Sequence, residues 1–412
     1  MRKQYVSPKA DAWQWKTDVP FSRSVVVGDQ VFVSGQQSLD SNGSVRNAGD
    51  VAEQTRNVFE NMKESLAQVG LELGDLARLN TYYVFEGSED EATRYWEDMT
   101  RVRLEYFPDP GPAATAVRVK GMPYPGQLIQ IEGIALQGES RKNRKRIMPE
   151  GSWDWSIPVP LTQGWRVDDR IYVGGQISAD KTGASVHAFD LDAQTQAIYG
   201  FIGNVLSDSG ASFDDLVHVK ICFKHHSKVS PDVSFNDRIM EITTEYVGEK
   251  AASALTSFGV DLLYPGLVLE IDAMAIVDPD RKRLTAENLG GRYQPGMFAD
   301  GVHAGEEIWV SGQIALNGDG QTVASGDMET QARVVIERLA KILSRGGATL
   351  DDIVKVNIFL VGDDSSISEL FHLVSAIWSE VAPNAKPAMT PVRVHELAHP
   401  DALIQMDCIA IV

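Results

Sequence analysis

The sequence predicts an α+β protein in which one unit of mixed strands and helices is repeated three times. A strand-like segment ends in Gly-Gln at Gln36, Gln176 and Gln313, which are 140 and 137 residues apart. A second glutamine follows each of these by 18 residues, a glycine follows that by 16, and an aspartate follows the second glutamine by 21. Self-similarity at a fixed spacing is the sequence signature of a repeat. A chain of 412 residues, 43% of them hydrophobic, is long enough for several domains.

The first unit opens with a predicted hairpin and continues into a helix. Residues 24–27 and 31–34 are β-prone and flank the polar turn Gly28-Asp29-Gln30. Asp50 with Glu53 forms a capping box, which predicts a helix start. The apolar stripe of this helix is Val58, Met62, Leu66 and Val69. Gly70 is then expected to end the helix. A strand, a second helix and two closing strands complete the unit.

Two charged segments mark the predicted boundaries between the units. Residues 141–146 are a basic run in an acidic protein, and residues 278–291 are a charged segment that ends in glycine. Both are typical of solvated linkers. We therefore expect three domains, at 1–140, 150–278 and 292–412.

The charge balance excludes several classes of partner. The chain has 38 Lys and Arg against 57 Asp and Glu, a formal net charge of −19. Nucleic acids and anionic membranes both require a cationic surplus, so neither is expected to bind. No apolar run is long enough to span a bilayer, and no signal-peptide pattern follows the N-terminus. The two cysteines, Cys222 and Cys408, are too few for a disulfide framework. A soluble cytoplasmic protein is expected.

The repeated motifs resemble the RidA family, also called YjgF or L-PSP endoribonuclease. The motifs are Ser-Gly-Gln or Gly-Gly-Gln after the first hairpin, Asp-x-x-x-Gln at the helix start, and the closing strands Ile-Gln-Ile-Glu-Gly-Ile-Ala, Leu-Glu-Ile-Asp-Ala-Met-Ala and Ile-Gln-Met-Asp-Cys-Ile-Ala. The resemblance covers essentially the whole chain, three times. It implies chorismate-mutase-like domains, each a sheet with two helices on one face. Because family members are typically trimers with ligand clefts between subunits, it also implies an intramolecular pseudo-trimer.

The resemblance further implies hydrolysis of reactive imines and enamines, with release of ammonia. In the family an arginine holds the substrate carboxylate, and a carboxylate with backbone groups positions the attacking water. No metal or organic cofactor is implied. The chain departs from the arginine and tyrosine of this set in all three copies. The arginine positions are assigned to Ala114, Ala252 and Met389. The tyrosine positions are assigned to Phe21, Leu161 and Phe298. A family asparagine is matched by Asn236, a candidate substrate-binding residue.

The candidate catalytic residues are acids of the closing strands and polar residues of a middle strand. Every copy keeps a strand acid, as Glu132, Asp272 and Asp407. Such an acid either positions a water in a solvated cleft or ties neighbouring backbone groups together. The second copy adds residues that share one face of a strand because side chains alternate. They are His218, Lys220 and Cys222. These residues are suited to acid–base or nucleophilic chemistry near Asp272, or to ordinary packing.

Two arginines offer a displaced anion clamp. Arg118 and Arg393 lie four residues beyond the missing arginine positions, on the same strand face, and Thr256 is assigned as their equivalent in the second copy. Both are candidate substrate-binding residues, with a solvated ion pair as the alternative. His395 and His399 lack metal-ligand spacing, so no metal site is expected.

We expect an enzyme: a metal-independent hydrolase or deaminase acting on a small nitrogen-containing metabolite (imine, enamine or amide) at a cleft between repeats. Two alternatives stay open. One is a ring-opening amidohydrolase on a three-repeat scaffold, although its serine motifs are not found. The other is a non-catalytic small-molecule-binding protein. The expected particle is a monomeric pseudo-trimer or a dimer of it, with a small-molecule substrate as its partner.

Overall fold

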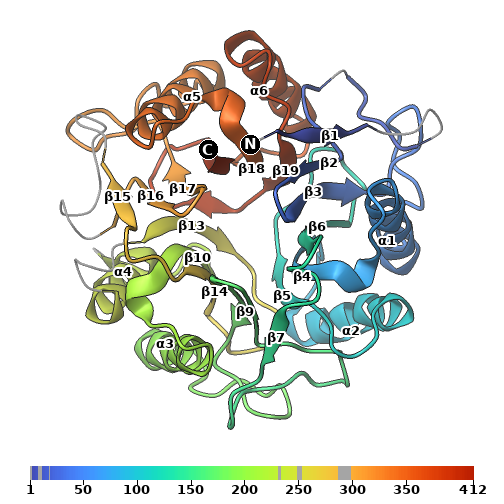
Figure 1. Cartoon of the computed structure of the whole chain (residues 1–412), viewed down its shortest axis with the longest axis vertical. Helices are drawn as coiled ribbons and strands as arrows, with labels where there is room; N and C mark the ends of the chain where they lie inside the picture. Colours follow the sequence, from blue (N-terminus) through green and yellow to red (C-terminus); the bar gives the residue numbers. More distant parts are fainter. Residues whose placement is uncertain (1, 8–11, 18, 231–232, 248–252, 286–297) are drawn as a thin grey trace.

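The protein is a ring of three similar units, with the helices outside and the sheets inside (Figure 1). This arrangement comes from a computed structural model, which describes all residues except 1, 8–11, 18, 231–232, 248–252 and 286–297. The predicted fold class, three α+β units forming a pseudo-trimer within one chain, is confirmed. None of the helices in the described part of the chain is long and apolar enough to cross a membrane.

The three units contain the same principal elements in the same order. The first comprises β1 (Gln4–Val6), β2 (Ser24–Val27), β3 (Gln30–Gln37), α1 (Val51–Ala67), β4 (Leu76–Tyr83), α2 (Glu89–Tyr106), β5 (Ala113–Arg118) and β6 (Ile129–Leu136). The second comprises β7 (Arg144–Ile147), β8 (Gly164–Val167), β9 (Arg170–Gln176), α3 (Leu191–Asp208), β10 (Leu216–Lys224), β11 (Lys228–Ser230), β12 (Val233–Ser234), α4 (Phe235–Tyr246), β13 (Ala254–Val260) and β14 (Leu269–Ile276). The third comprises β15 (Lys282–Leu284), β16 (Gly301–Ala304), β17 (Glu307–Gln313), α5 (Met328–Arg345), β18 (Ile353–Leu360), α6 (Ile367–Val381), β19 (Ala388–Arg393), β20 (Glu396–Leu397) and β21 (Ile404–Ile411).

Each unit folds around one mixed sheet. In the first the strand order is β1-β2-β3-β6-β4-β5, and the third repeats it as β15-β16-β17-β21-β18-β19. The second follows the same plan, and β20 of the third unit is added to its edge beside β13. Only the last pair of the shared plan is parallel, β4 with β5 and its counterparts. The second helix of each unit connects these parallel strands, as a crossover must.

The repeated polar landmarks have structural roles. Asp50, Asp190 and Asp327 cap the first helix of their units by accepting a hydrogen bond from a backbone N–H three residues on. The second glutamine of each unit, Gln54 in the first, is buried and donates to two loop carbonyls while accepting a backbone N–H. Gly70 has φ of 76°, a conformation that glycine adopts without strain and that ends the helix region.

Backbone bridges join the units into a closed ring. Ser22 pairs with Ala388, which links the first unit to the third, and Ala113 pairs with Thr162, which links the first to the second. The second and third units are joined where the N–H of Ala299 donates to the carbonyl of Ser253. Because β5, β13 and β19 each lie beside the next unit around the ring, these sheet edges are covered within one chain.

One chain is therefore expected to be the smallest stable particle. Light scattering should give about 45 kDa, the mass of one 45.2 kDa chain, or an even multiple of it. A particle that required three chains around one three-fold axis would contradict this arrangement, because the single chain already closes the ring.

Candidate functional site

The inner faces of the three sheets meet in a buried polar network on the axis of the ring. Its acids are Glu132, Asp272 and Asp407, which are only 3%, 1% and 4% exposed. Each acid receives a hydrogen bond from a threonine of the preceding unit. The three pairs are Thr390 with Glu132, Thr115 with Asp272, and Thr256 with Asp407. The network therefore has the three-fold pattern of the repeats.

Asp272 is the acid most strongly held by cations. Arg78 of the first unit forms an ion pair with Oδ1, and Lys220 Nζ lies 2.8 Å from Oδ2. Burial alone raises the pKa of this carboxyl, but Arg78 and Lys220 outweigh burial and lower its pKa to about 2. Asp272 is thus a fixed anion at neutral pH.

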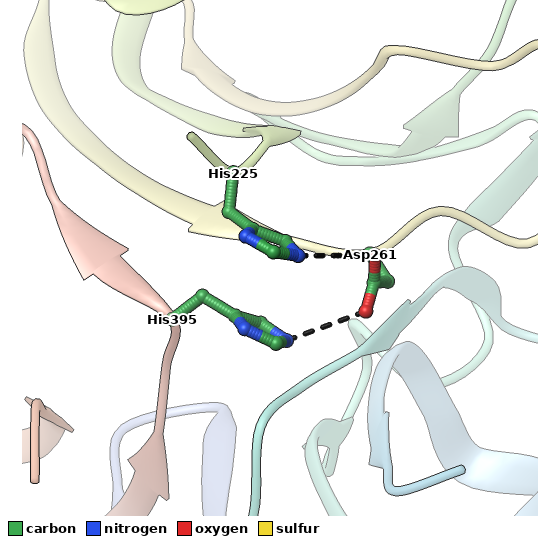
Figure 2. Close-up of side chains that lie close together, drawn as sticks. All are labelled: His225, Asp261 and His395. Atoms are coloured by element: carbon green, nitrogen blue, oxygen red, sulfur yellow. Dashed lines mark ion pairs between the residues drawn. The ribbon is translucent and has the colours of Figure 1, made fainter. Parts of the chain in front are cut away.

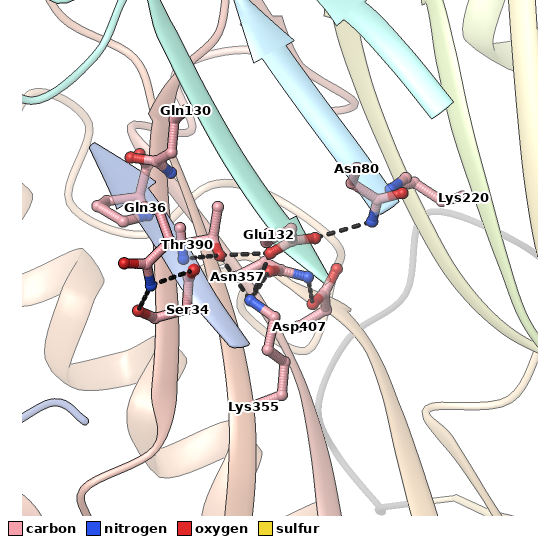
Figure 3. Close-up of polar contacts among 12 residues, drawn as sticks. Ser34, Gln36, Asn80, Gln130, Glu132, Lys220, Lys355, Asn357, Thr390 and Asp407 are labelled. Carbon is pink, nitrogen blue, oxygen red and sulfur yellow. Dashed lines mark hydrogen bonds and ion pairs between the residues drawn. The ribbon is translucent and has the colours of Figure 1, made fainter. Parts of the chain in front are cut away.

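Glu132 has an equivalent environment (Figure 3). Lys355 of the third unit and Thr390 contact Oε2, and Asn80 Nδ2 donates to Oε1 at 2.8 Å. Burial opposes ionisation of Glu132, but the charges of Lys355 and Lys220 hold its pKa below the usual value. Like Asp272, it is an anion whose oxygens are already engaged.

Asp407 differs because no cation among the described residues contacts it directly. Its oxygens accept hydrogen bonds from Thr256 and Asn357, both at 2.8 Å. His218 occupies the position that Arg78 and Lys355 occupy in the other units, and it reaches only Thr256, at 2.9 Å. Burial raises the pKa of Asp407 to about 6 and lowers that of His218 to about 3. At pH 7 His218 is therefore neutral, whereas Asp407 is mostly ionised and becomes protonated just below neutral pH.

The network encloses little free space. A cavity of about 40 Å³ lies beside Glu132, Lys220, Lys355 and Asp407. Such a volume holds about three water molecules at most and no metabolite. The strand acids thus lie in the interior and not in a solvated cleft, which favours the structural one of the two alternatives for them. Cys222 is also buried; burial raises the pKa of its thiol, and it does not line this cavity.

The candidate substrate-binding residues are already engaged elsewhere. Arg118 donates to the carbonyls of Phe85 and Gly87, and Arg393 forms an ion pair with Asp364. Asn236 is buried at the start of α4, where Ser257 Oγ donates to its side chain at 2.5 Å. Arg118 and Arg393 therefore lie at the ends of β5 and β19, where their guanidinium groups already contact other groups of the protein.

The strand register corrects one part of the sequence assignment. Ala114, Leu255 and Met389 occupy equivalent positions opposite the middle strands. Leu255 therefore replaces Ala252, which lies outside the described residues. Gly259, not Thr256, is the equivalent of Arg118 and Arg393. A proline precedes this strand in the first and third copies, as Pro112 and Pro387, and marks its start in the sequence. The second copy has no such proline, which is why its positions were assigned out of register. The absence of arginine at all three positions still holds.

A larger cavity lies between the first and third units. It has a volume of about 400 Å³, within the range of small-molecule sites. Trp13, Trp15, Phe21 and Arg23 of the first unit line it together with Met389 of the third. Trp15 also packs on Phe371 of α6, with ring centroids 4.9 Å apart. This cleft therefore contains Phe21 and Met389, the residues assigned to the family tyrosine and arginine.

The corresponding boundary between the first and second units is more closed. Trp155, the counterpart of Trp15, stacks on Trp96 of α2 with centroids 4.7 Å apart. The cavity beside these two rings measures only about 20 Å³ and is lined by Ala114 and Arg103. Arg103 is 9% exposed, and its Nε and Nη2 lack hydrogen-bond partners. Two equivalent boundaries of the ring thus differ in how much space they leave.

Sequence reasoning missed two buried ionisable residues, Glu270 and Arg23. Glu270 lies two positions before Asp272 on β14, where the other units have Gln130 and Gln405. Burial and the nearby Asp272 raise its pKa to about 8. The pattern of two glutamines and one glutamate is a signal that comparison of the repeats could have used, because it indicates a site that prefers a neutral side chain.

We expect Glu270→Gln to remove part of the pH dependence of stability. The Glu270 carboxyl has a pKa near 8 in the folded protein, against 4.5 for the free group. Its preference for the proton in the folded state therefore contributes fully to the free energy of unfolding below pH 4.5. This stability is lost as the pH rises to 8. Urea unfolding at pH 5, 7 and 8.5 should therefore show that the free energy of unfolding of the variant increases relative to that of the parent as the pH rises. A constant difference across this range would show that Glu270 is ionised in the folded protein.

A cluster of His225, Asp261 and His395 lies where the three units meet (Figure 2). Both imidazole Nε2 atoms are 3.3 Å from Asp261 oxygens. The two rings are stacked 3.7 Å apart and 4° from parallel, so their lone pairs run side by side and do not converge on one ion. Lys224 Nζ also lies 2.8 Å from Asp261. The certain ion pair of this cluster is Lys224 with Asp261, while burial lowers the pKa of His395, so the histidines join the units mainly through hydrogen bonds to Asp261.

Comparisons with known proteins agree with the repeats. The family model described as Endoribonuclease L-PSP matches residues 14–137, 157–277 and 293–412. A RutC family protein of Pyrococcus abyssi is 33% identical over 115 residues, which are 28% of this chain and 86% of the relative. The 3-aminoacrylate deaminase RutC of Acinetobacter baylyi is 34% identical over 119 residues, with the same two shares. A chorismatase crystal structure aligns with a TM-score of 0.55 at 14% identity, over 83% of this chain and 95% of that one, which shows a shared fold.

Proposed function

Because the chain belongs to the L-PSP endoribonuclease family in three tandem copies, we propose that it is a hydrolase or deaminase of a small nitrogen-containing metabolite. The substrate class is an imine, enamine or amide, bound in the cleft between the first and third units. The cavity of about 400 Å³ in this cleft is the observation that supports the location. The cavities on the axis and beside Trp155 measure only about 40 and 20 Å³. The name of the relative from Acinetobacter baylyi, an aminoacrylate deaminase, supports the substrate class.

The lining of the cleft suits substrate binding and orientation. Trp15 and Phe21 offer aromatic faces, while Ser34 and Arg23 offer polar groups. For an imine or enamine, water adds to the carbon of the C=N bond, the C–N bond then breaks, and the products are a carbonyl compound and ammonia. The cleft contributes by holding the reacting carbon in one orientation toward water.

Filling the cleft tests this location. Val19 lines it, and Val159 is the matching residue of the second unit, 140 positions on. We expect Val19→Trp to abolish ammonia release from a responsive imine, enamine or amide, and Val159→Trp to retain it. A coupled ammonia assay with both folded variants makes the measurement. Equal activity of the two variants would exclude this cleft. Binding without any turnover across the panel would instead identify a small-molecule-binding protein.

A second candidate is a contribution to proton transfer from the buried network on the axis, whose cavity of about 40 Å³ holds water and no metabolite. It is favoured by Lys220 beside Asp272 and by the proximity of His218 and Asp407, which are groups suited to proton transfer. The test is turnover by three variants, Glu132→Gln, Asp272→Asn and Asp407→Asn. Loss of activity in only one folded variant would locate one specialised site there. Full activity in all three would make the strand acids structural.

We expect neither ribonuclease activity nor salt-sensitive RNA binding, despite the description of the family. The reason is the net charge of −19, which repels the phosphate backbone. The measurement is filter binding to single-stranded RNA at salt concentrations between about 50 and 200 mM, the range over which binding through phosphate contacts weakens. Micromolar binding that weakens steeply with salt would contradict the expectation.

A further inference from the structure

We infer that Arg23 is the anion-binding group of the cleft between the first and third units, and that it takes the carboxylate of a small planar ligand. This inference rests on the proposed function and specifies its substrate class. Its starting point is a buried arginine that lines the cavity of about 400 Å³. The position of the family arginine is occupied by Met389, and neither Arg118 nor Arg393 lines this cavity.

The Arg23 side chain is held in place by stacking. Its guanidinium carbon lies 3.2 Å from the centre of the Trp13 ring, a cation–π contact. Trp13 is itself fixed by donating from Nε1 to Gln36. Because stacking uses the face of the planar guanidinium, its N–H groups remain in the plane for a ligand. Such an edge matches the two oxygens of a carboxylate.

Arg23 has unused hydrogen-bonding capacity in the interior. The residue is 7% exposed, and its Nη1 is buried with no hydrogen-bond partner in the described part of the chain. Burying an unsatisfied charged donor is costly, and a ligand carboxylate bound to this guanidinium in the large cavity would offset that cost. Burial lowers the pKa of Arg23 to about 9, while the charge of Glu64 opposes this effect. The guanidinium therefore stays cationic at neutral pH.

The cleft gathers positive charge in an otherwise acidic protein. Lys16 lines the same cavity, and its Nζ lies 5.0 Å from the centre of the Tyr124 ring. Among the described residues that line this cavity there is no Asp or Glu. Trp13, Trp15 and Phe21 supply flat apolar walls beside the two cations. Charge and shape together favour a planar molecule that carries a carboxylate.

The other units show that Arg23 is specific to this cleft. The equivalent positions, one residue before β8 and β16, are Gln163 and Asp300. Gln163 donates to the Trp153 carbonyl and accepts from Gln176, so its hydrogen bonds are satisfied internally. An arginine is not required to build this corner of the unit. The substitution Arg23→Gln is accordingly a change that the scaffold already tolerates in its second copy.

Titration calorimetry with benzoate and benzamide tests the inference without requiring turnover. The two probes have nearly the same shape and differ in charge. We expect the parent to bind benzoate at least about tenfold more tightly than benzamide, since a charge-assisted pair is worth on the order of 1.5–3 kcal/mol. In Arg23→Gln this preference should disappear while benzamide affinity is retained. Arg23→Lys should keep only part of it, because an ammonium lacks the planar fork.

Arg103→Gln is the matched control, since Arg103 is a similarly buried arginine with unpaired nitrogens in a different cavity. It should bind both probes as the parent does. Equal affinity of the parent for benzoate and benzamide, or an unchanged preference in Arg23→Gln, would overturn the inference. In that case, ammonia release from neutral substrates would still support the proposed hydrolase or deaminase function. If Arg23→Gln and Arg103→Gln both lost the preference for benzoate over benzamide, the cause would be general destabilisation. That result would also contradict a specific role for Arg23.

Discussion

Asp272→Asn is expected to destabilise the protein by about 3–5 kcal/mol, which is the cost of removing one partner from a buried ion pair. Asp272 is 1% exposed and pairs with Arg78 from the first unit and Lys220 from its own. An asparagine carries no charge, so both cations would remain buried without their counter-ion. Urea unfolding at pH 7 provides the measurement.

Asp407→Asn is the control for this prediction. Asp407 accepts hydrogen bonds from Thr256 and Asn357 but has no direct cation, and burial raises its pKa to about 6. A neutral amide replaces it without leaving a charge unpaired, so we expect a loss of about 1 kcal/mol or less. Equal destabilisation by the two substitutions would show that cross-unit charge pairing does not distinguish these acids.

Hydrolysis of free amino-acid imines is expected to be weak, at least about 10²-fold below that of single-repeat family members. A bidentate guanidinium–carboxylate pair contributes two charge-assisted hydrogen bonds, each worth about 1.5–3 kcal/mol. The residues at its position are Ala114, Leu255 and Met389, none of which can hydrogen-bond a carboxylate through its side chain. The loss of about 3–6 kcal/mol in orientation and binding converts to roughly 10²–10⁴ in kcat/KM.

Met389→Arg and Ala114→Arg separate the two described clefts. Met389 lines the cavity of about 400 Å³, whereas Ala114 lines one of about 20 Å³ that has no room for a substrate. Partial restoration of imine turnover is expected only for Met389→Arg, measured as ammonia release with folding checked by circular dichroism. Robust turnover of amino-acid imines by the parent would mean that another group, such as Arg23, already fully replaces the missing arginine.

The repeated elements could be predicted from the sequence because they depend on local chemistry. Asp50, its counterparts and the glycine at 70 act within one turn of a helix, and the alternation along Val217–Phe223 follows from strand geometry alone. The repeat spacing then placed equivalent elements in register for most of the chain. The exception was β13, where the second copy lacks the proline that marks this strand in the others.

The site was less predictable because it depends on how the units pack. Alternation shows that His218 and Lys220 share a face, but not that this face meets the ring axis, where Arg78 of another unit reaches Asp272. Nor does the sequence reveal that Arg23 stacks on Trp13 beside a large cavity while Gln163 closes the equivalent corner. These differences arise from contacts between residues far apart in the chain.

The electron density of a crystal soaked with benzoate tests most directly whether Arg23 binds a carboxylate between the first and third units. We predict density for the ligand between the first and third units, with its carboxylate at the edge of the Arg23 guanidinium and its ring beside Trp15 or Phe21. Ligand density in the axial network around Asp272, or in the cavity beside Trp155 with the Arg23 cleft empty, would contradict it.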